Sequence, residues 1–132
     1  MKIAIIKLSA LGDIVNTMFV LQFIKKQYPF AKIDWIVEKR FKGVLEFNPH
    51  ISNIKCVNLQ KAKRNKSLIL LFKELSKVKS FGNYDLVIDF QGLIKSAIIA
   101  KLINAKEIVI NIVIMEINKL LYIEYTKAGF AK

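Results

Sequence analysis

Residues 2–17 read KIAIIKLSALGDIVNT, a strand pattern that changes directly into a helix pattern. Residues 2–8 form a short, nearly continuous apolar run rich in isoleucine, which is typical of a central parallel strand covered on both faces. Apolar residues then recur at helical spacing over residues 14–28, and Pro29 ends the segment. Asp13 is therefore expected at or beside the start of a helix, at the sheet edge where α/β proteins bind ligands.

Two interpretations of Asp13 are open from its spacing alone. A carboxylate here can simply cap the helix by accepting a backbone N–H, which stabilises it by about 0.5–2 kcal/mol. A carboxylate that follows a strand can also point into the ligand crevice of an open sheet. The loop has a lone Gly12 and not the G-x-G-x-x-G pattern of a dinucleotide site. This favours a loop that presents a side chain over one that wraps a pyrophosphate.

The rest of the chain continues to alternate strand and helix patterns. Further strands are expected at 32–37, 54–59, 85–89 and 107–114, and helices at 40–47, 67–79 and 93–103. This alternation predicts one α/β domain with a Rossmann-like parallel sheet and helices on both faces. If the strand order is 3-2-1-4-5, the first and fourth strands are neighbours. Asp13 and the loop Asp89-Phe90-Gln91-Gly92 would then face each other across one crevice, although Asp89 and Gly92 can also simply cap a helix and permit a turn.

The chain is strongly basic. Its 132 residues contain 22 lysines and arginines against 10 acidic residues, a formal charge of +12. This excess predicts an anionic partner: nucleic acid, an acidic membrane surface or a phosphorylated ligand. Only Arg40 and Arg64 are arginines, and arginine is the residue that reads bases bidentately, so no specific nucleic-acid binding is expected. The segment KAKRNK at 61–66 is either a solvated face or an anion site beside the crevice.

Single cysteine and histidine residues limit the chemistry. Cys56 alone cannot form an intramolecular disulfide, which fits a reducing compartment. His50 alone excludes a multi-histidine metal centre, and no metal site is expected. No stretch approaches 18 uncharged apolar residues and no secretory signal is expected, so we expect a cytoplasmic protein with at most peripheral membrane contact. The aromatic residues expected in the core are Phe19, Phe23, Trp35, Phe47 and Phe72.

Three motifs together resemble a known family. They are KLSALGD at 7–13, IDWIVE at 33–38 and YDLVIDFQGLIKS at 84–96, and in this order and spacing they resemble the N-terminal half of the bacterial lipopolysaccharide heptosyltransferases I, in glycosyltransferase family 9. The resemblance implies a GT-B architecture of two Rossmann-like domains. It also implies inverting transfer of heptose from ADP-heptose to Kdo of the lipid A inner core, at the cytoplasmic face of the inner membrane. No cofactor is implied beyond this donor substrate.

The resemblance also assigns roles to residues. Asp13 matches the catalytic aspartate of the family, the general base that takes a proton from the acceptor hydroxyl. The implied acceptor-binding residues are Ser9, Ala10, Gly12, Lys61, Lys63, Arg64, Lys66, Gln91 and Gly92. Asn16 stands where many members carry histidine, so any auxiliary role of that histidine does not carry over.

The resemblance covers residues 1–106, the expected acceptor-binding domain. Residues 107–132 form a divergent tail whose Ile, Asn and Lys bias is typical of an AT-rich genome read out of frame. We therefore expect a truncated or frameshifted product that lacks the nucleotide-sugar domain, is inactive alone and binds ADP-heptose only with a second domain. Its expected partner is the Kdo-lipid A acceptor. The alternative is a non-enzymatic basic module that binds anionic lipid or nucleic acid, which requires only the lysines.

Overall fold

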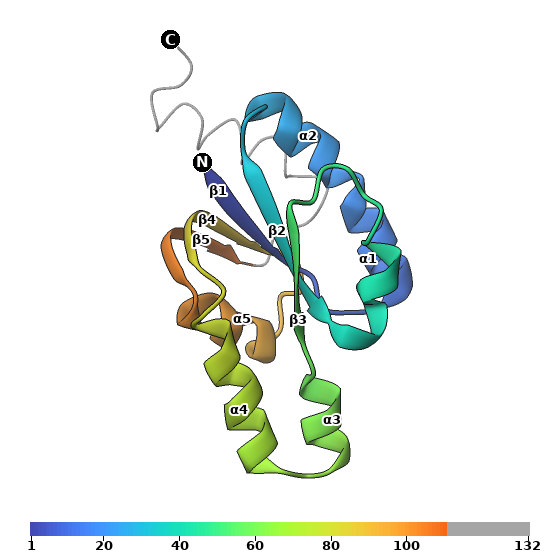
Figure 1. Cartoon of the computed structure of the whole chain (residues 1–132), viewed down its shortest axis with the longest axis vertical. Coiled ribbons are helices and arrows are strands. Elements are labelled where there is room, and N and C mark those ends of the chain that lie inside the picture. The colour runs from blue at the N-terminus through green and yellow to red at the C-terminus, as the bar shows by residue number, and fades with distance from the viewer. Residues whose placement is uncertain (111–132) are drawn as a thin grey trace.

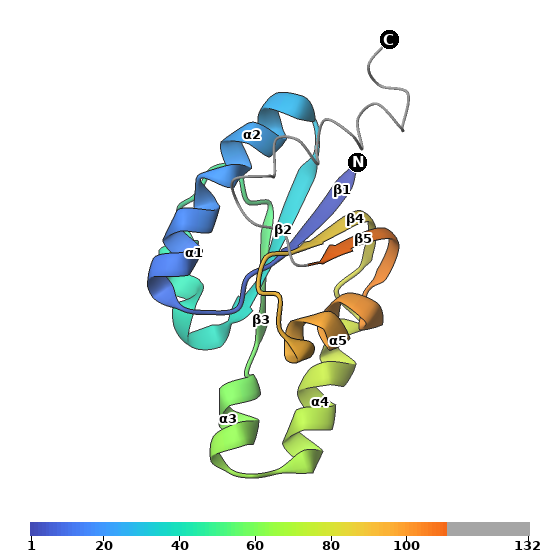
Figure 2. The same cartoon turned by 180° about the vertical axis from the view of Figure 1, so that it is seen from behind.

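The computed structural model describes residues 1–110, which form a five-stranded parallel sheet with helices on both faces (Figures 1 and 2). The strands are β1 (Lys2–Ile6), β2 (Lys32–Glu38), β3 (Asn53–Val57), β4 (Asn83–Asp89) and β5 (Asn104–Ile110). The helices are α1 (Leu11–Met18), α2 (Val20–Gln27), the 3-10 helix η1 (Lys39–Val44), α3 (Leu59–Arg64), α4 (Leu68–Val78) and α5 (Ile94–Leu102). The strand order β3-β2-β1-β4-β5 confirms the predicted order, and every pairing is parallel.

Four elements differ from the sequence prediction, one of them the helix expected at 40–47, which is the shorter 3-10 helix η1 at Lys39–Val44. The single helix expected over residues 14–28 is divided at Phe19, whose N–H bonds to the Asn16 carbonyl, and the Thr17 hydroxyl donates to the Asp13 carbonyl at 2.7 Å. Such back-bonding by threonine bends helices. Helix α3 was not predicted, and it begins inside the segment expected to end the third strand. The strand expected at 107–114 begins earlier, at Asn104, and residues 107–110 of the expected tail belong to it; residues 111–132, which include the last four expected strand residues and the rest of the tail, lie outside the described residues.

Two apolar cores enclose the central strand, as its uninterrupted apolar run predicts. On one face, Ile3 and Ile5 pack with Ile14 and Leu21 of α1 and α2. On the other face, residues of the strand pack against α4 and α5. The residues of β1 from Ile3 to Ile6 are fully buried as a result. The central strand is therefore covered on both faces beneath the loops that leave the carboxyl edge of the sheet.

The prediction for the aromatic residues is wrong in four of five cases. Trp35 is fully buried and donates its indole N–H to the Lys7 carbonyl at 3.1 Å. The exposed fractions of the others are 63% for Phe19, 39% for Phe23, 92% for Phe47 and 65% for Phe72. Phe19, Phe23 and Phe72 lie in or beside helices that carry apolar residues on the exposed side as well, so spacing alone did not identify the side that faces the sheet, and Phe47 lies in the turn after η1. Within the described residues, no helix is long and apolar enough to cross a bilayer.

Candidate functional site

The loops that follow β1 and β4 are joined by one side chain. Gln91 accepts hydrogen bonds through Oε1 from the backbone N–H groups of Leu8 and Ser9, at 3.2 and 3.4 Å. Its Nε2 donates to the Ser9 hydroxyl at 3.4 Å. These contacts hold the two loops side by side at the carboxyl edge of the sheet, as the predicted strand order requires. The structure thus gives Gln91 a positioning role in addition to the role implied by the family resemblance.

The turn after β4 is organised by Asp89. Its side chain is fully buried, and Oδ1 accepts from the backbone N–H groups of Gln91 and Gly92 at 2.9 and 3.2 Å. Oδ2 accepts from the Ser96 hydroxyl at 3.0 Å, which ties the turn to α5. Gly92 has φ of +68°, a left-handed conformation that glycine adopts without strain. The carboxylate of Asp89 therefore shapes the loop and does not face the crevice.

Asp13 is exposed in the first turn of α1. The N-cap of this helix is Ala10, and no side chain caps it, so the capping interpretation does not hold. Among residues 1–110, the carboxylate of Asp13 forms no hydrogen bond or ion pair. The helix dipole favours a negative charge at this position. The structure thus leaves a carboxylate accessible at the carboxyl edge of the sheet.

A basic cavity of about 610 Å³ opens near the same edge. Its lining residues come from the β1 loop, the end of β2, η1, α3, α4 and α5: Ser9, Glu38, Arg40, Leu59, Gln60, Lys63, Arg64, Leu71 and Lys95. A second cavity of about 440 Å³ shares Glu38, Arg40, Gln60 and Arg64 and adds Lys39, Asn58 and Lys61. Cationic side chains thus outnumber the one carboxylate in both linings. Such a lining suits a ligand that carries carboxylate or phosphate groups.

The cavities include some of the predicted acceptor-binding residues and not others. Ser9, Lys63 and Arg64 line the larger cavity, and Lys61 lines the smaller one. The remaining predicted positions, Ala10, Gly12, Lys66, Gln91 and Gly92, line neither of them. Sequence reasoning did not single out Arg40 and Lys95, although Lys95 lies inside the third family motif.

Sequence reasoning also missed Glu38, which ends β2 and lies in the wall of both cavities. Only 3% of its surface is exposed, and its Oε1 accepts from the Leu59 backbone N–H at 3.1 Å. Burial raises the pKa of Glu38, against the opposing effects of the Leu59 and Gln60 N–H groups and the charges of Lys95 and Arg40. Its place at the carboxyl end of a predicted strand, within the second family motif, was the signal that could have found it.

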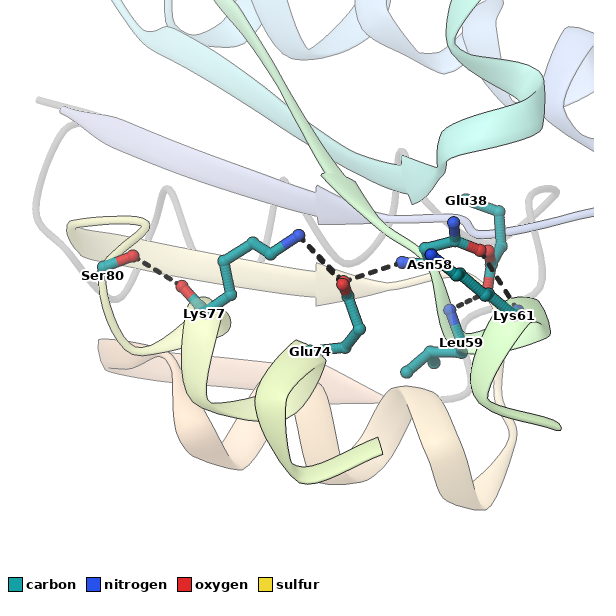
Figure 3. A network of polar contacts seen from close by, with 7 residues as sticks. All are labelled: Glu38, Asn58, Leu59, Lys61, Glu74, Lys77 and Ser80. Carbon is teal, nitrogen blue, oxygen red and sulfur yellow. Dashed lines mark hydrogen bonds and ion pairs between the residues drawn. The ribbon is translucent and has the colours of Figure 1, made fainter. Parts of the chain in front are cut away.

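A second carboxylate supports the same helix start (Figure 3). Glu74 of α4 accepts from the Asn58 backbone N–H at 2.9 Å and pairs with Lys77 at 2.9 Å. The Asn58 side chain in turn caps α3 by accepting from the Lys61 N–H at 3.2 Å. The first turn of α3 is therefore fixed from both β2 and α4. This fixes the base of the segment that carries Lys61, Lys63 and Arg64.

The described residues offer no metal site of the usual kind. Within residues 1–110, no group of three or more His, Cys, Asp or Glu side chains could hold a metal ion.

Sequence comparison identifies relatives of known activity. No family model matches the chain. The chain is 42% identical over 104 residues to lipopolysaccharide heptosyltransferase 1 of Campylobacter coli, covering 79% of this chain and 29% of that protein. It is 32% identical over 100 residues to the protein of the same name from Pseudomonas aeruginosa, covering 74% and 28%. The chain thus matches less than a third of the length of these relatives.

Solved structures of related enzymes share the fold. The Escherichia coli heptosyltransferase WaaC with ADP superposes with a TM-score of 0.70 at 27% identity, over 81% of this chain and 35% of that one. WaaC with ADP-2-deoxy-2-fluoro heptose gives a TM-score of 0.72 over the same shares. These matches confirm the Rossmann-like fold as part of a GT-B architecture. They also confirm the resemblance drawn from the three motifs, and the chain belongs to the lipopolysaccharide heptosyltransferase family of glycosyltransferases.

Proposed function

We propose that this chain is the acceptor-binding half of an inverting heptosyltransferase. The basic cavity holds the Kdo and phosphate groups of a Kdo-lipid A acceptor, and Asp13 is the general base. The observation that carries this proposal is an unpartnered, exposed carboxylate at the start of α1, four residues after Ser9, which lines the cationic cavity; Asp13 itself lines neither cavity. Membership of an enzyme family makes a non-enzymatic binding module the less favoured reading.

The chemistry follows from these positions. Asp13 takes the proton of the acceptor hydroxyl as the oxygen attacks the anomeric carbon of the donor, and the bond to ADP breaks on the opposite face with inversion. A positioned base contributes about 10²–10⁴-fold to the rate. Lys63, Arg64 and Lys95 hold the acceptor anions as the oxygen attacks, which fixes the orientation of the hydroxyl.

The donor side requires a second domain. The WaaC structure with ADP contains a chain of which only 35% is matched by the chain described here. We propose that the part of the enzyme described here binds the acceptor, and that ADP-heptose binds only when a second domain is present. Holding donor and acceptor together supplies about 7–11 kcal/mol of the barrier, so the chain alone transfers no heptose. The site of action is the cytoplasmic face of the inner membrane, with peripheral membrane contact.

Calorimetry with the soluble, deacylated Kdo-containing saccharide tests the acceptor site. Replacing Lys63 and Arg64 by serine should weaken binding at least tenfold. A matched control replaces Lys26 and Lys101 by serine, because both are exposed and line neither cavity. Equal affinities in the cavity variant and the wild type would show that the basic segment is only a solvated face and does not bind the acceptor.

A further inference from the structure

Helices α3 and α4 form a hairpin that projects from one end of the molecule (Figures 1 and 2). On its inner side, Leu71 and Leu75 of α4 pack against the core and Val78 is buried. On its outer side, three large apolar residues at the start of α4 are exposed: Leu68 at 69%, Ile69 at 79% and Phe72 at 65%. Positions separated by three or four residues lie on one helix face. We call Leu68, Ile69 and Phe72 the apolar tip.

Cationic residues flank the apolar tip along the chain. They come from α3, the connection that follows it and α4: Lys61, Lys63, Arg64, Lys66 and Lys73, all of them exposed. No acidic residue occurs between residues 59 and 73. Among residues 1–110, none of these five side chains forms an ion pair. The tip therefore presents apolar side chains and uncompensated positive charge on the same end of the hairpin.

We propose that this hairpin docks on an anionic lipid surface, with the apolar tip in the interface and the surrounding cations among the headgroups. Apolar side chains beside lysines are the combination that binds anionic bilayers. Of the three apolar side chains only Phe72 can stack on a base, and arginine, which reads bases bidentately, occurs once between residues 59 and 73, which disfavours a nucleic acid as the occupant. A symmetric contact with a second copy would bring two sets of cations together, which is unfavourable.

The docking surface and the proposed acceptor site share one helix. Leu71 lines the basic cavity from α4, while Leu68 and Phe72 on the same helix are exposed to solvent. A hairpin seated on the bilayer would bring the cavity to the sugars that stand on the headgroups. Only this step rests on the proposed function, because binding to a bare lipid surface requires no acceptor.

Co-sedimentation of the full chain with vesicles that carry no saccharide tests the docking. We expect binding to vesicles of phosphatidylethanolamine and phosphatidylglycerol, and at least tenfold weaker binding to phosphatidylcholine. The triple variant Leu68→Gln, Ile69→Gln, Phe72→Gln should lose at least tenfold in affinity for the anionic vesicles. The matched control is Phe30→Gln with Phe47→Gln, which removes apolar side chains exposed by 93% and 92% elsewhere. It should bind as the wild type does.

An environment-sensitive label gives an independent reading that does not depend on folding of the triple variant. In a Cys56→Ser background, a bimane on Ile69→Cys should shift to the blue when anionic vesicles are added, and one on Phe47→Cys should not. Unshifted emission at residue 69, or unchanged vesicle binding by the triple variant, would overturn the proposal. So would a dimer that the triple variant abolishes, or tighter binding to duplex DNA than to vesicles. Saccharide calorimetry is a separate readout, so failure of docking leaves the acceptor proposal standing.

Discussion

Glu38 and Glu74 accept hydrogen bonds from adjacent backbone N–H groups, those of Leu59 at 3.1 Å and Asn58 at 2.9 Å. The two carboxylates come from β2 and α4 and meet at the start of α3 (Figure 3). They fix a short helix whose exposed lysines and arginine repel one another. Their environments differ, however, and their pKa values move in opposite directions.

Glu38→Gln should raise the free energy of unfolding at pH 7. Burial raises the pKa of Glu38 in the folded state, so its ionised form destabilises the fold at pH values above that pKa. Protonation removes this cost as the pH falls through the raised pKa towards the ordinary value of 4.5. Urea unfolding at pH 7 and at pH 4.5 measures the difference, and we expect the advantage of the variant to shrink at the lower pH. A variant less stable than the wild type at pH 7 would contradict this.

Glu74→Gln should have the opposite effect. Partial burial alone would raise the pKa of Glu74, but the hydrogen bonds from Lys77 and the Asn58 N–H outweigh it and the pKa is lowered. The ionised carboxylate therefore stabilises the fold above the ordinary pKa of 4.5, and this contribution is lost as the pH falls through the lowered pKa. The same urea series should show a loss of stability at pH 7 that diminishes at acid pH. Equal stability of variant and wild type at pH 7 would show that the contacts of Glu74 contribute nothing net.

Tyr84→Phe should lower the free energy of unfolding by about 1–3 kcal/mol, because it leaves a buried carboxylate with one partner fewer. The Tyr84 hydroxyl donates to Asp34 Oδ2 at 2.6 Å, and Asp34 is fully buried. Burial and the neighbouring carboxylate raise the pKa of Tyr84, so the hydroxyl remains a donor at neutral pH. Chemical denaturation gives the value. The variant Asn53→Ala removes the side-chain amide that donates to Asp34 Oδ1 at 3.0 Å. We expect this longer bond to contribute less, so that the variant lowers the free energy of unfolding by a smaller amount.

The sequence was sufficient for the sheet but not for the whole site. The apolar run at residues 2–8 and the spacing of later strands predicted the order of all five strands, because parallel strands and their crossovers leave few topologies. The position of Asp13 after β1 and the basic character of Lys63 and Arg64 were also predictable. Glu38 could have been noticed from its place after a predicted strand, but its contact with Leu59 could not, because Leu59 lies 21 residues away in a helix that the sequence did not predict. The exposure of Phe72 could not be predicted either, because α4 has apolar residues on two sides and the sequence alone does not show which side packs against the sheet.

Gln91→Leu should loosen the loop after β1. The variant removes the acceptor of the Leu8 and Ser9 N–H groups, each bond contributing about 1 kcal/mol. Hydrogen exchange at these two amides should accelerate several-fold, while Gln22→Leu on the exposed side of α2 should leave it unchanged. Unaltered exchange at Leu8 and Ser9 in the Gln91 variant would show that the loop holds its shape without this side chain.

Asp13→Asn is the direct test of the proposed base, and it requires this chain joined to a heptosyltransferase second domain. The amide has the shape of the carboxylate but cannot accept the proton, so turnover should fall by about two orders of magnitude or more. The fold should be unaffected, because within the described residues the Asp13 carboxylate forms no hydrogen bond or ion pair. Asn16→Ala, one turn further along the exposed face of α1, is the matched control and should retain near-normal turnover. If the Asp13 variant turned over at the rate of this control, another group would have to take the proton, and the exposed carboxylate would have no part in the chemistry.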